Sequence, residues 1–334
     1  MRRIKNIFLM IFAVICLFAV ASCGKSADYT IGILQYATHD ALDYATQGFK
    51  EKVNELIPEG KTVKFIVKNP EGDQASMTTM ASSLVRKCDL VLGNATPAAT
   101  ALKAASITEG KTDLPILFTS VSDPVDAKLV ASLSNPGGNI TGTSDINPIE
   151  QQVDLMLDLK GNDCKIGFLY SADEPNSEVQ CNEAKAYLTS KGFKSNNIVT
   201  KTVQDNNSIT PMATALCSGS DKVDIIYIPT DNRLASNVSQ VTNTTTPAKV
   251  PVICGEGSMV KNGGTLSLSI SYIELGKTTG EMAAEILFEG KAPSSIPVEA
   301  QTDVSKFEFT INNEALTAMS ITLSDEFKAK YNIQ

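Results

Sequence analysis

The chain has 334 residues, a formal net charge of −8 and a single histidine, His39. This length is sufficient for two domains of ordinary size. An acidic surface repels phosphate backbones, which argues against nucleic acid as a partner, and one histidine excludes metal sites built from several. A serine hydrolase would have to use His39, and no G-x-S-x-G motif accompanies it.

The first 22 residues have the pattern of an export signal. Three basic residues within the first five positions precede an apolar run over 7–20, which is too short for a transmembrane helix. Small residues then lead directly into Cys23. This pattern resembles a bacterial lipoprotein signal, and an ordinary cleaved signal or an uncleaved anchor is the alternative. We therefore expect a signal peptide over 1–22, a lipidated tether over 23–28, and a mature net charge of −11 on the extracytoplasmic side of the membrane.

Short apolar runs alternate with stretches of helical periodicity through the first half of the chain. Strands are predicted at 29–34, 63–67, 90–93 and 115–118. Helices are predicted at 41–56, 74–85 and from Pro97 onward, because apolar side chains recur there every three or four residues.

The same pattern restarts after roughly residue 145. Strands are predicted at 164–170, 197–203, 224–228 and 250–253. Helices are predicted at 150–159, 177–191, 211–217 and 274–288, the last bounded by Gly290. This alternation predicts an α/β fold of parallel sheets covered on both faces, and the restart predicts two similar lobes.

In such sheets, ligands bind beyond the carboxyl ends of the strands, so the segments that follow the predicted strands are the candidate site. These segments are rich in hydroxyl and amide side chains. The candidate ligand-binding residues are Gln35, Tyr36, His39, Thr96, Ser120, Val121 and Ser122 in the first half, and Asn176, Asp231, Asn232, Gly255 and Glu256 in the second.

The residue types in these segments suit the two charged ends of an α-amino acid. Thr96 followed by proline is a good helix start, with an N-cap hydroxyl and free N–H groups that attract a carboxylate. Ser120 and Ser122 could add hydroxyl donors, and Asp231 from the opposite lobe could hold an ammonium group. Each of them could instead be a solvated loop residue or a helix cap.

His39 is expected to lie at the mouth of the cleft or to cap the 41–56 helix, rather than to act in catalysis. Tyr36 and Tyr44 could stack on an apolar ligand side chain, or belong to the core or the surface. Beyond Cys23, the cysteines are widely and irregularly spaced at positions 88, 164, 181, 217 and 254. We expect most of them to be buried small apolar residues, with one disulfide in the second half as an alternative and no zinc site.

A longer motif lies between residues 115 and 144. It contains Pro115 to Val125, then Leu129-Val130, then the PGGN-x-TG stretch over 136–142. This motif resembles the ABC-transporter substrate-binding lipoproteins of the tryptophan/tyrosine-binding type. Supporting matches lie at 95–99, 174–177, 229–232 and 272–287, the last with Leu275-Gly276-Lys277.

The resemblance implies a periplasmic-binding-protein fold of type I, with two Rossmann-like lobes joined by a three-segment hinge. Crossovers are expected near 143–149, 268–274 and 302–306. The first lobe would comprise 29–145 plus about 273–303, and the second 146–272 plus about 304–334. By the same analogy, Thr96, Ser120 and Ser122 would face the ligand carboxylate, Asp231 the ammonium group, and Asn176 would line the second lobe.

The resemblance also implies a monomeric, non-enzymatic receptor without a cofactor, anchored to the membrane through Cys23. It would close over a small molecule, an amino acid such as Tyr, Trp or Phe, and deliver it to an ABC permease. The permease and its ATPase would be separate chains, because no P-loop motif is present.

Several alternatives remain open from the residues. The ligand could be a branched-chain amino acid, a sugar or a nucleoside, and an adhesin or sensor could use the same fold. An enzyme would need a pair among Asp40, Asp123, Glu174 and Asp231. The chain has no tryptophan, so ring stacking would come from Tyr36, Tyr170, Phe118 or aliphatic side chains.

Overall fold

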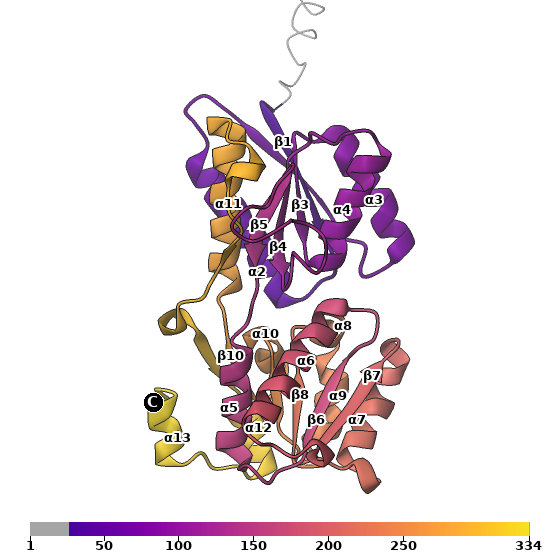
Figure 1. Cartoon of the computed structure of the whole chain (residues 1–334), viewed down its shortest axis with the longest axis vertical. Coiled ribbons are helices and arrows are strands. Elements are labelled where there is room, and N and C mark those ends of the chain that lie inside the picture. Colours follow the sequence, from indigo (N-terminus) through magenta and orange to yellow (C-terminus); the bar gives the residue numbers. More distant parts are fainter. Residues whose placement is uncertain (1–26, 334) are drawn as a thin grey trace, which may run out of the picture.

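The computed structural model describes residues 27–333, so the export signal and Cys23 lie outside the described residues. The described chain forms two α/β lobes, one above the other in Figure 1. Each lobe is built on a six-stranded sheet with helices on both faces. The predicted α/β fold with two parallel-sheet lobes is confirmed.

The first lobe contains a wholly parallel sheet in the order β11-β5-β4-β3-β1-β2. Its strands are β1 (Tyr29–Gln35), β2 (Val63–Lys68), β3 (Leu90–Asn94), β4 (Ile116–Val121), β5 (Ile140–Ser144) and β11 (Glu299–Ala300). Its helices are α2 (Asp40–Leu56), α3 (Gln74–Lys87), α4 (Thr96–Thr108) and α11 (Tyr272–Glu289).

The second lobe has the strand order β12-β10-β9-β8-β6-β7, in which only β12 is antiparallel to its neighbour. Its strands are β6 (Ile166–Ser171), β7 (Ile198–Val203), β8 (Ile225–Ile228), β9 (Val252–Cys254), β10 (Leu266–Ser269) and β12 (Glu308–Ile311). Its helices are α5 (Ile149–Lys160), α6 (Pro175–Ser190), α7 (Ile209–Cys217), α8 (Asn232–Ser236), α9 (Val238–Thr245), α10 (Gly257–Lys261), α12 (Asn313–Met319) and α13 (Asp325–Lys330).

The predicted strands are the ones with continuous apolar runs, because both faces of a central parallel strand are buried. Every residue of β3, β4 and β6 is buried, whereas the edge strand β2 is partly exposed. Sequence periodicity missed β5, which is also fully buried but rich in hydroxyl groups. In the structure, Thr141 donates to the carbonyl oxygen of Ile296 at 2.7 Å, and Thr143 bonds the Thr279 hydroxyl at 2.7 Å.

The chain passes from one lobe to the other three times, between β5 and α5, between β10 and α11, and between β11 and β12. Hydrogen bonds tie these segments together. The Ile270 N–H donates to Asn147 Oδ1 at 3.3 Å, and the Gln301 side chain exchanges two bonds with the Ser271 backbone. The crossings therefore lie side by side at one edge of the lobe junction.

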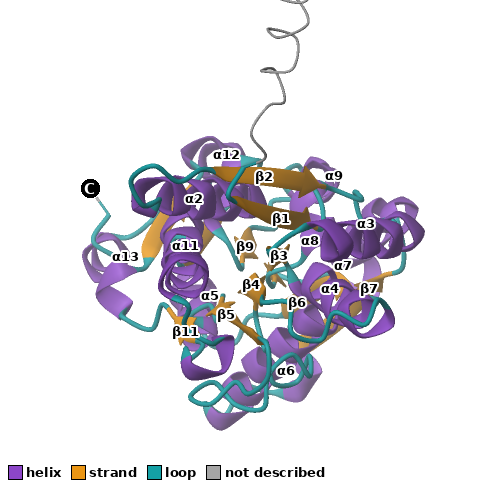
Figure 2. Ribbon diagram, turned by 90° about the horizontal axis from the view of Figure 1, so that it is seen from above, coloured by secondary structure: helices purple, strands orange, loops and turns teal. Residues whose placement is uncertain are grey.

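Helix α11 is anchored to the first lobe by close packing against α2, as the view from above shows (Figure 2). Gly48 and Gly276 lie at this contact, where each faces backbone atoms of the other helix. Buried side chains of α11, including Met282 and Ala283, join the core on this face of the sheet.

The five cysteines at positions 88–254 are free, and all but Cys217 are buried, as expected for small apolar residues. Within residues 27–333, no helix is long and apolar enough to cross a membrane.

Candidate functional site

The carboxyl ends of the two sheets face each other across the lobe junction, where direct hydrogen bonds join the lobes. Asn262 Nδ2 of the second lobe donates to Asp40 Oδ2 of the first at 3.1 Å. His39 Nε2 lies 3.2 Å from Asn232 Oδ1. Gln180 Nε2 donates to the Ser122 hydroxyl at 2.8 Å, and the Ser236 hydroxyl donates to the carbonyl oxygen of Thr38 at 3.2 Å. The lobes are therefore in contact, and three sequence-predicted site residues (His39, Ser122 and Asn232) make that contact.

Two residues at the carboxyl edge of the first sheet have left-handed backbone conformations. Ala95 follows β3 with φ of 85°, and Ser120 near the end of β4 has φ of 56°. Such angles are costly for residues other than glycine and are concentrated at functional sites. Ser120 is also buried, and its hydroxyl has no hydrogen-bond partner among the described residues.

The start of α4 differs from the sequence prediction. Ala95 is the N-cap, and Thr96 is already the first helical residue, with Pro97 second. The reason is the backbone turn at Ala95, which begins the helix one residue early and leaves Thr96 half-buried at the amino end. Prediction of Thr96 as a hydroxyl N-cap was therefore wrong, although the residue still lies at a helix N-terminus beside the junction.

Two of the predicted site residues in the first lobe, Gln35 and Val121, have side chains that face their own lobe. Gln35 donates to Asp43 of α2 at 2.6 Å and accepts from Thr46 at 2.7 Å, so its side chain is held against its own lobe. Val121 is completely buried in the core between the sheet and its helices. Neither side chain bonds the second lobe in this structure.

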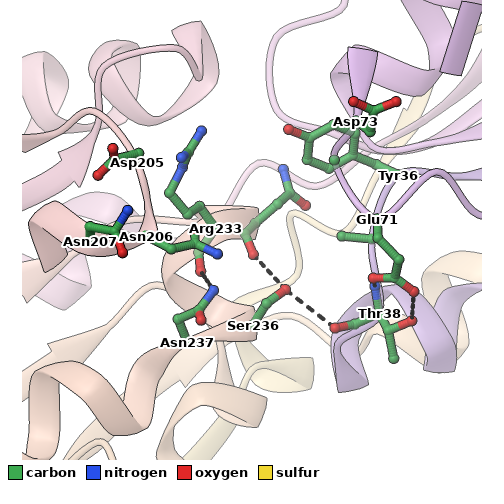
Figure 3. A pocket seen from close by; sticks show the side chains of 13 residues that line it. Tyr36, Thr38, Glu71, Asp73, Asp205, Asn206, Asn207, Arg233, Ser236 and Asn237 are labelled. Carbon is green, nitrogen blue, oxygen red and sulfur yellow. Dashed lines mark hydrogen bonds between the residues drawn. The ribbon is translucent and has the colours of Figure 1, made fainter. Parts of the chain in front are cut away.

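Tyr36 lines a cavity of about 700 Å³ between the lobes (Figure 3). The first lobe contributes Tyr36, Thr38, Glu71 and Asp73, and the second contributes residues 205–207 and 232–237 in part. Figure 3 shows Tyr36 and Arg233 on opposite sides of this cavity. Burial, with the nearby Glu174 and Asp173 charges, raises the pKa of Tyr36 to about 12, so the phenol is neutral and can donate a hydrogen bond.

Asp231 is buried and its two carboxylate oxygens accept hydrogen bonds within its own lobe. They accept from the Ser171 N–H at 2.6 Å, the Ser171 hydroxyl at 2.9 Å and the Leu234 N–H at 2.9 Å. The side chain thus caps α8 and fastens it to the end of β6. Here the carboxylate has a structural task.

Glu174, in the loop after β6, is a buried carboxylate that the sequence did not place in the site. It accepts from the backbone N–H groups of Asn232 and Arg233 and from the Asn232 side chain. Burial, together with the neighbouring Asp231 charge, raises the pKa of Glu174 to about 8. Glu174 holds Asn232 in place for its contact with His39.

Asn176, Gly255 and Glu256 also lie at the junction end of the second lobe. Asn176 donates to the carbonyl oxygen of Thr230 at 3.1 Å. Gly255 has no space for a side chain, because a Cβ would lie 2.5 Å from the backbone of the loop after β8. Glu256 is buried, accepts from the Ser258 hydroxyl at 2.7 Å, and lies 3.8 Å from His39 Nδ1.

His39 occupies the N-cap position of α2, but its side chain reaches across to the second lobe instead of capping the helix. Only 8% of the residue is exposed. It therefore lies inside the junction and contacts both Asn232 and Glu256.

The strand-end rule missed other junction residues for two reasons. Asp145 follows β5, a strand that the apolar pattern did not reveal. Gln180 lies within α6, where no strand end marks it, and its Oε1 accepts from the Thr230 N–H at 3.1 Å. Asn147 belongs to the first crossing and bonds the Thr230 hydroxyl at 3.1 Å.

Several buried polar atoms at the junction have no hydrogen-bond partner within residues 27–333. They include His39 Nδ1, Ser120 Oγ, Asp145 Oδ1, Asn176 Oδ1, Arg233 Nε and Glu256 Oε2. Each belongs to a segment at the carboxyl end of a strand. Buried polar groups are normally paired, so this concentration marks a place where a polar molecule can bind. Two α/β lobes with such a junction define a two-lobed solute-binding protein.

Comparison with known proteins identifies the family. A family model described as "ABC transporter substrate binding protein" matches residues 30–332, and the chain belongs to that family. A curated relative, the tyrosine-binding protein of Clostridioides difficile, is 33% identical over 303 residues, covering 90% of this chain and 84% of the relative.

Two solved structures extend the comparison. An ABC domain from Streptococcus pneumoniae in complex with L-Trp is 35% identical, covers 91% of this chain and 98% of its own, and has a TM-score of 0.82. The ligand-free, open structure of a Clostridium difficile substrate-binding protein with adhesive properties is 33% identical, covers 89% and 96%, and has a TM-score of 0.66. At nearly equal identity, this chain is therefore more similar in structure to the L-Trp complex.

Proposed function

We propose that this chain captures an aromatic L-amino acid between its lobes and delivers it to the permease of an ABC importer. Two observations support this ligand class: the relatives named for tyrosine and L-Trp, and the mixture of unpaired buried hydroxyl, imidazole and carboxylate atoms at the junction. The second observation carries the proposal, because an amino acid has both a negative and a positive end to satisfy such groups.

Closure of the lobes would be the mechanism of capture. A ligand that contacts both lobes stabilises the closed arrangement over the open one. The direct contacts of His39 with Asn232 and of Ser122 with Gln180 are consistent with a closed arrangement, as is the greater similarity to the L-Trp complex. No bond in the ligand would be made or broken.

The carboxylate of the ligand would lie against the first lobe. There, the amino end of α4 provides N–H groups and a partial positive charge, and Ser120 provides an unpaired hydroxyl. Thr96 and Ser122 border the same edge. Asn176 would face the ligand from the second lobe.

Membrane attachment would come from a lipid on Cys23, with the described lobes acting as a monomer outside the cytoplasmic membrane. The permease and the ATPase would be separate chains.

Thermal unfolding of the purified chain in detergent, with and without candidate ligands, tests the proposal. A ligand at one hundred times its Kd stabilises the native state by about 2.7 kcal/mol, which corresponds to a rise in Tm of several degrees. We expect such a rise with L-Tyr, L-Trp or L-Phe. A rise only with a sugar, a nucleoside or a branched-chain amino acid would refute the assigned ligand class.

A further inference from the structure

Four buried carboxylates gather around the lobe junction, and they divide into two kinds. Asp145, Glu174, Asp231 and Glu256 are each about 1% exposed. The oxygens of Glu174 and Asp231 are all occupied by hydrogen-bond donors of the second lobe. These two are committed to holding loops and helix α8.

Asp145 and Glu256 each use one oxygen and leave the other unpaired. Asp145 Oδ2 accepts from the Tyr272 hydroxyl at 2.9 Å, and Glu256 Oε1 accepts from the Ser258 hydroxyl at 2.7 Å. Among the described residues, Asp145 Oδ1 and Glu256 Oε2 have no donor with hydrogen-bond geometry, although the nearby Ser122 hydroxyl partly offsets the rise in the pKa of Asp145 that burial causes. A buried carboxylate oxygen without a donor is costly, so both positions favour an incoming N–H or O–H group.

The two carboxylates belong to one electrostatic neighbourhood. Burial raises the pKa of both, and the charge of Asp145 raises the pKa of Glu256 further. Both charges also contribute to raising the pKa of Tyr272. The charges of the two carboxylates therefore influence each other, and Asp145 contacts Tyr272 directly through a hydrogen bond.

This neighbourhood has few positive charges of its own. Within residues 27–333, the only ion-pair contact of either carboxylate is His39 Nδ1, at 3.8 Å from Glu256 Oε1. No lysine or arginine in that range pairs with them. A cation supplied from outside would pair the free oxygens and offset the repulsion between two buried acids.

We propose that Asp145 and Glu256 bind the α-ammonium group of the ligand, and that Asp231 serves only to hold α8. This inference rests on the proposed function, since it assigns the positive end of the same amino acid. An ammonium group has three N–H donors, enough for both free oxygens with one to spare, and hydrogen bonds between charged groups are the strong ones.

The placement also links binding to closure. Glu256 belongs to the second lobe, its neighbour His39 to the first, and Asp145 to a crossing. A cation bound between Glu256 and Asp145 would draw the second lobe toward the crossings, where His39 already meets Glu256 and Asn232. The ammonium group would therefore be bound by both carboxylates only when the lobes are closed.

Calorimetric titration of the full-length protein with two probes tests the assignment. L-tyrosine carries the ammonium group, and 3-(4-hydroxyphenyl)propionate has the same ring and carboxylate without it. We expect Glu256→Gln and Asp145→Asn each to weaken L-tyrosine binding by 10-fold or more, in line with about 1.5–3 kcal/mol for a hydrogen bond to a charged group. Their affinity for the propionate should stay within about threefold of the unaltered protein.

Asp231→Asn is the matched control. It should lower the Tm, because it weakens the cap of α8, but leave the ratio of the two affinities unchanged. Circular dichroism of each variant checks folding, and Glu256→Gln suffices if Asp145→Asn does not fold. The assignment is wrong, while the proposed function stands, if Glu256→Gln leaves the ratio of the L-tyrosine affinity to the propionate affinity unchanged. It is also wrong if this ratio falls only in Asp231→Asn. If the unaltered protein binds neither L-Tyr, L-Trp nor L-Phe, the proposed function and this assignment both fall.

Discussion

Replacing Gly276 by alanine should force apart the two helices that fasten a crossing segment to the first lobe. A Cβ at this position would lie 2.1 Å from the carbonyl oxygen of Ala45 in α2, whereas ordinary contact begins near 3.4 Å. The obstacle is backbone and cannot rotate away, so α2 and α11 must separate by about 1 Å.

Two opposing contributions determine how much Gly276→Ala changes the free energy of unfolding. Alanine favours the helix over glycine by about 1 kcal/mol, because glycine loses more backbone freedom on folding. Overpacking of a tight contact costs about 1–3 kcal/mol, and a backbone clash belongs at the upper end of that range. We therefore expect Gly276→Ala to lower the free energy of unfolding by about 2 kcal/mol, which corresponds to a Tm lower by about 4–8 °C.

Thermal unfolding followed by circular dichroism provides the measurement. Thr278→Ala, two residues further along α11 and partly exposed, controls for helix propensity and should change the Tm by little. Gly48→Ala meets the carbonyl oxygen of Ile273 at 2.1 Å from the other side of the same contact. The double variant should therefore lose less than the sum of the single losses. A Gly276→Ala protein as stable as the unaltered one would refute this account of the packing.

Three further outcomes follow from the site and the core. Burial raises the pKa of Glu174 to about 8, so the native state keeps a proton that the unfolded state releases near pH 4.5. The free energy of unfolding should therefore fall as the pH rises from about 5 to 8. Glu174→Gln should flatten this slope in denaturant titrations, and an unchanged slope would contradict the reasoning. Gln180→Ala removes the bond to Ser122 across the lobes and should weaken L-tyrosine binding about fivefold or more in calorimetry, unless lobe contact adds nothing to closure. In native alkylation followed by mass spectrometry, Cys217 should react first, since the other cysteines of the described chain are buried; equal labelling of all would be inconsistent with the core.

Much of the fold follows from local patterns. A central parallel strand is buried on both faces, so it appears as a short apolar run such as 29–34 or 90–93, and the structure confirms these strands. Strand β5 and the short strands β10 and β12 could not be found in this way. The hydroxyl groups of β5 are buried by pairing with distant residues, as when Thr143 meets Thr279 in α11. Strand β12 is partly exposed, and β10 alternates leucine with serine, so neither has a continuous apolar run.

The site was predictable only in part. The structure brings the strand-end residues His39, Ser122, Asn232 and Glu256 to the junction, because the carboxyl ends of parallel strands share one edge. Their contact with a ligand stays a prediction. The rule could not reach Gln180 in the middle of a helix, and it could not show that Gln35 turns back onto α2.

The sequence by itself determined the α/β class, the two lobes and the family resemblance, because these depend on hydrophobic spacing and on contiguous motifs such as PGGN-x-TG. Only the tertiary structure decided which of the buried acids keeps an oxygen without a donor among the described residues. Asp231 and Glu256 both follow strands of the second lobe and cannot be told apart from sequence. In the folded chain, Asp231 meets donors of Ser171, 60 residues away, while one oxygen of Glu256 meets none among the described residues. The difference comes from long-range hydrogen bonding, which no local pattern encodes.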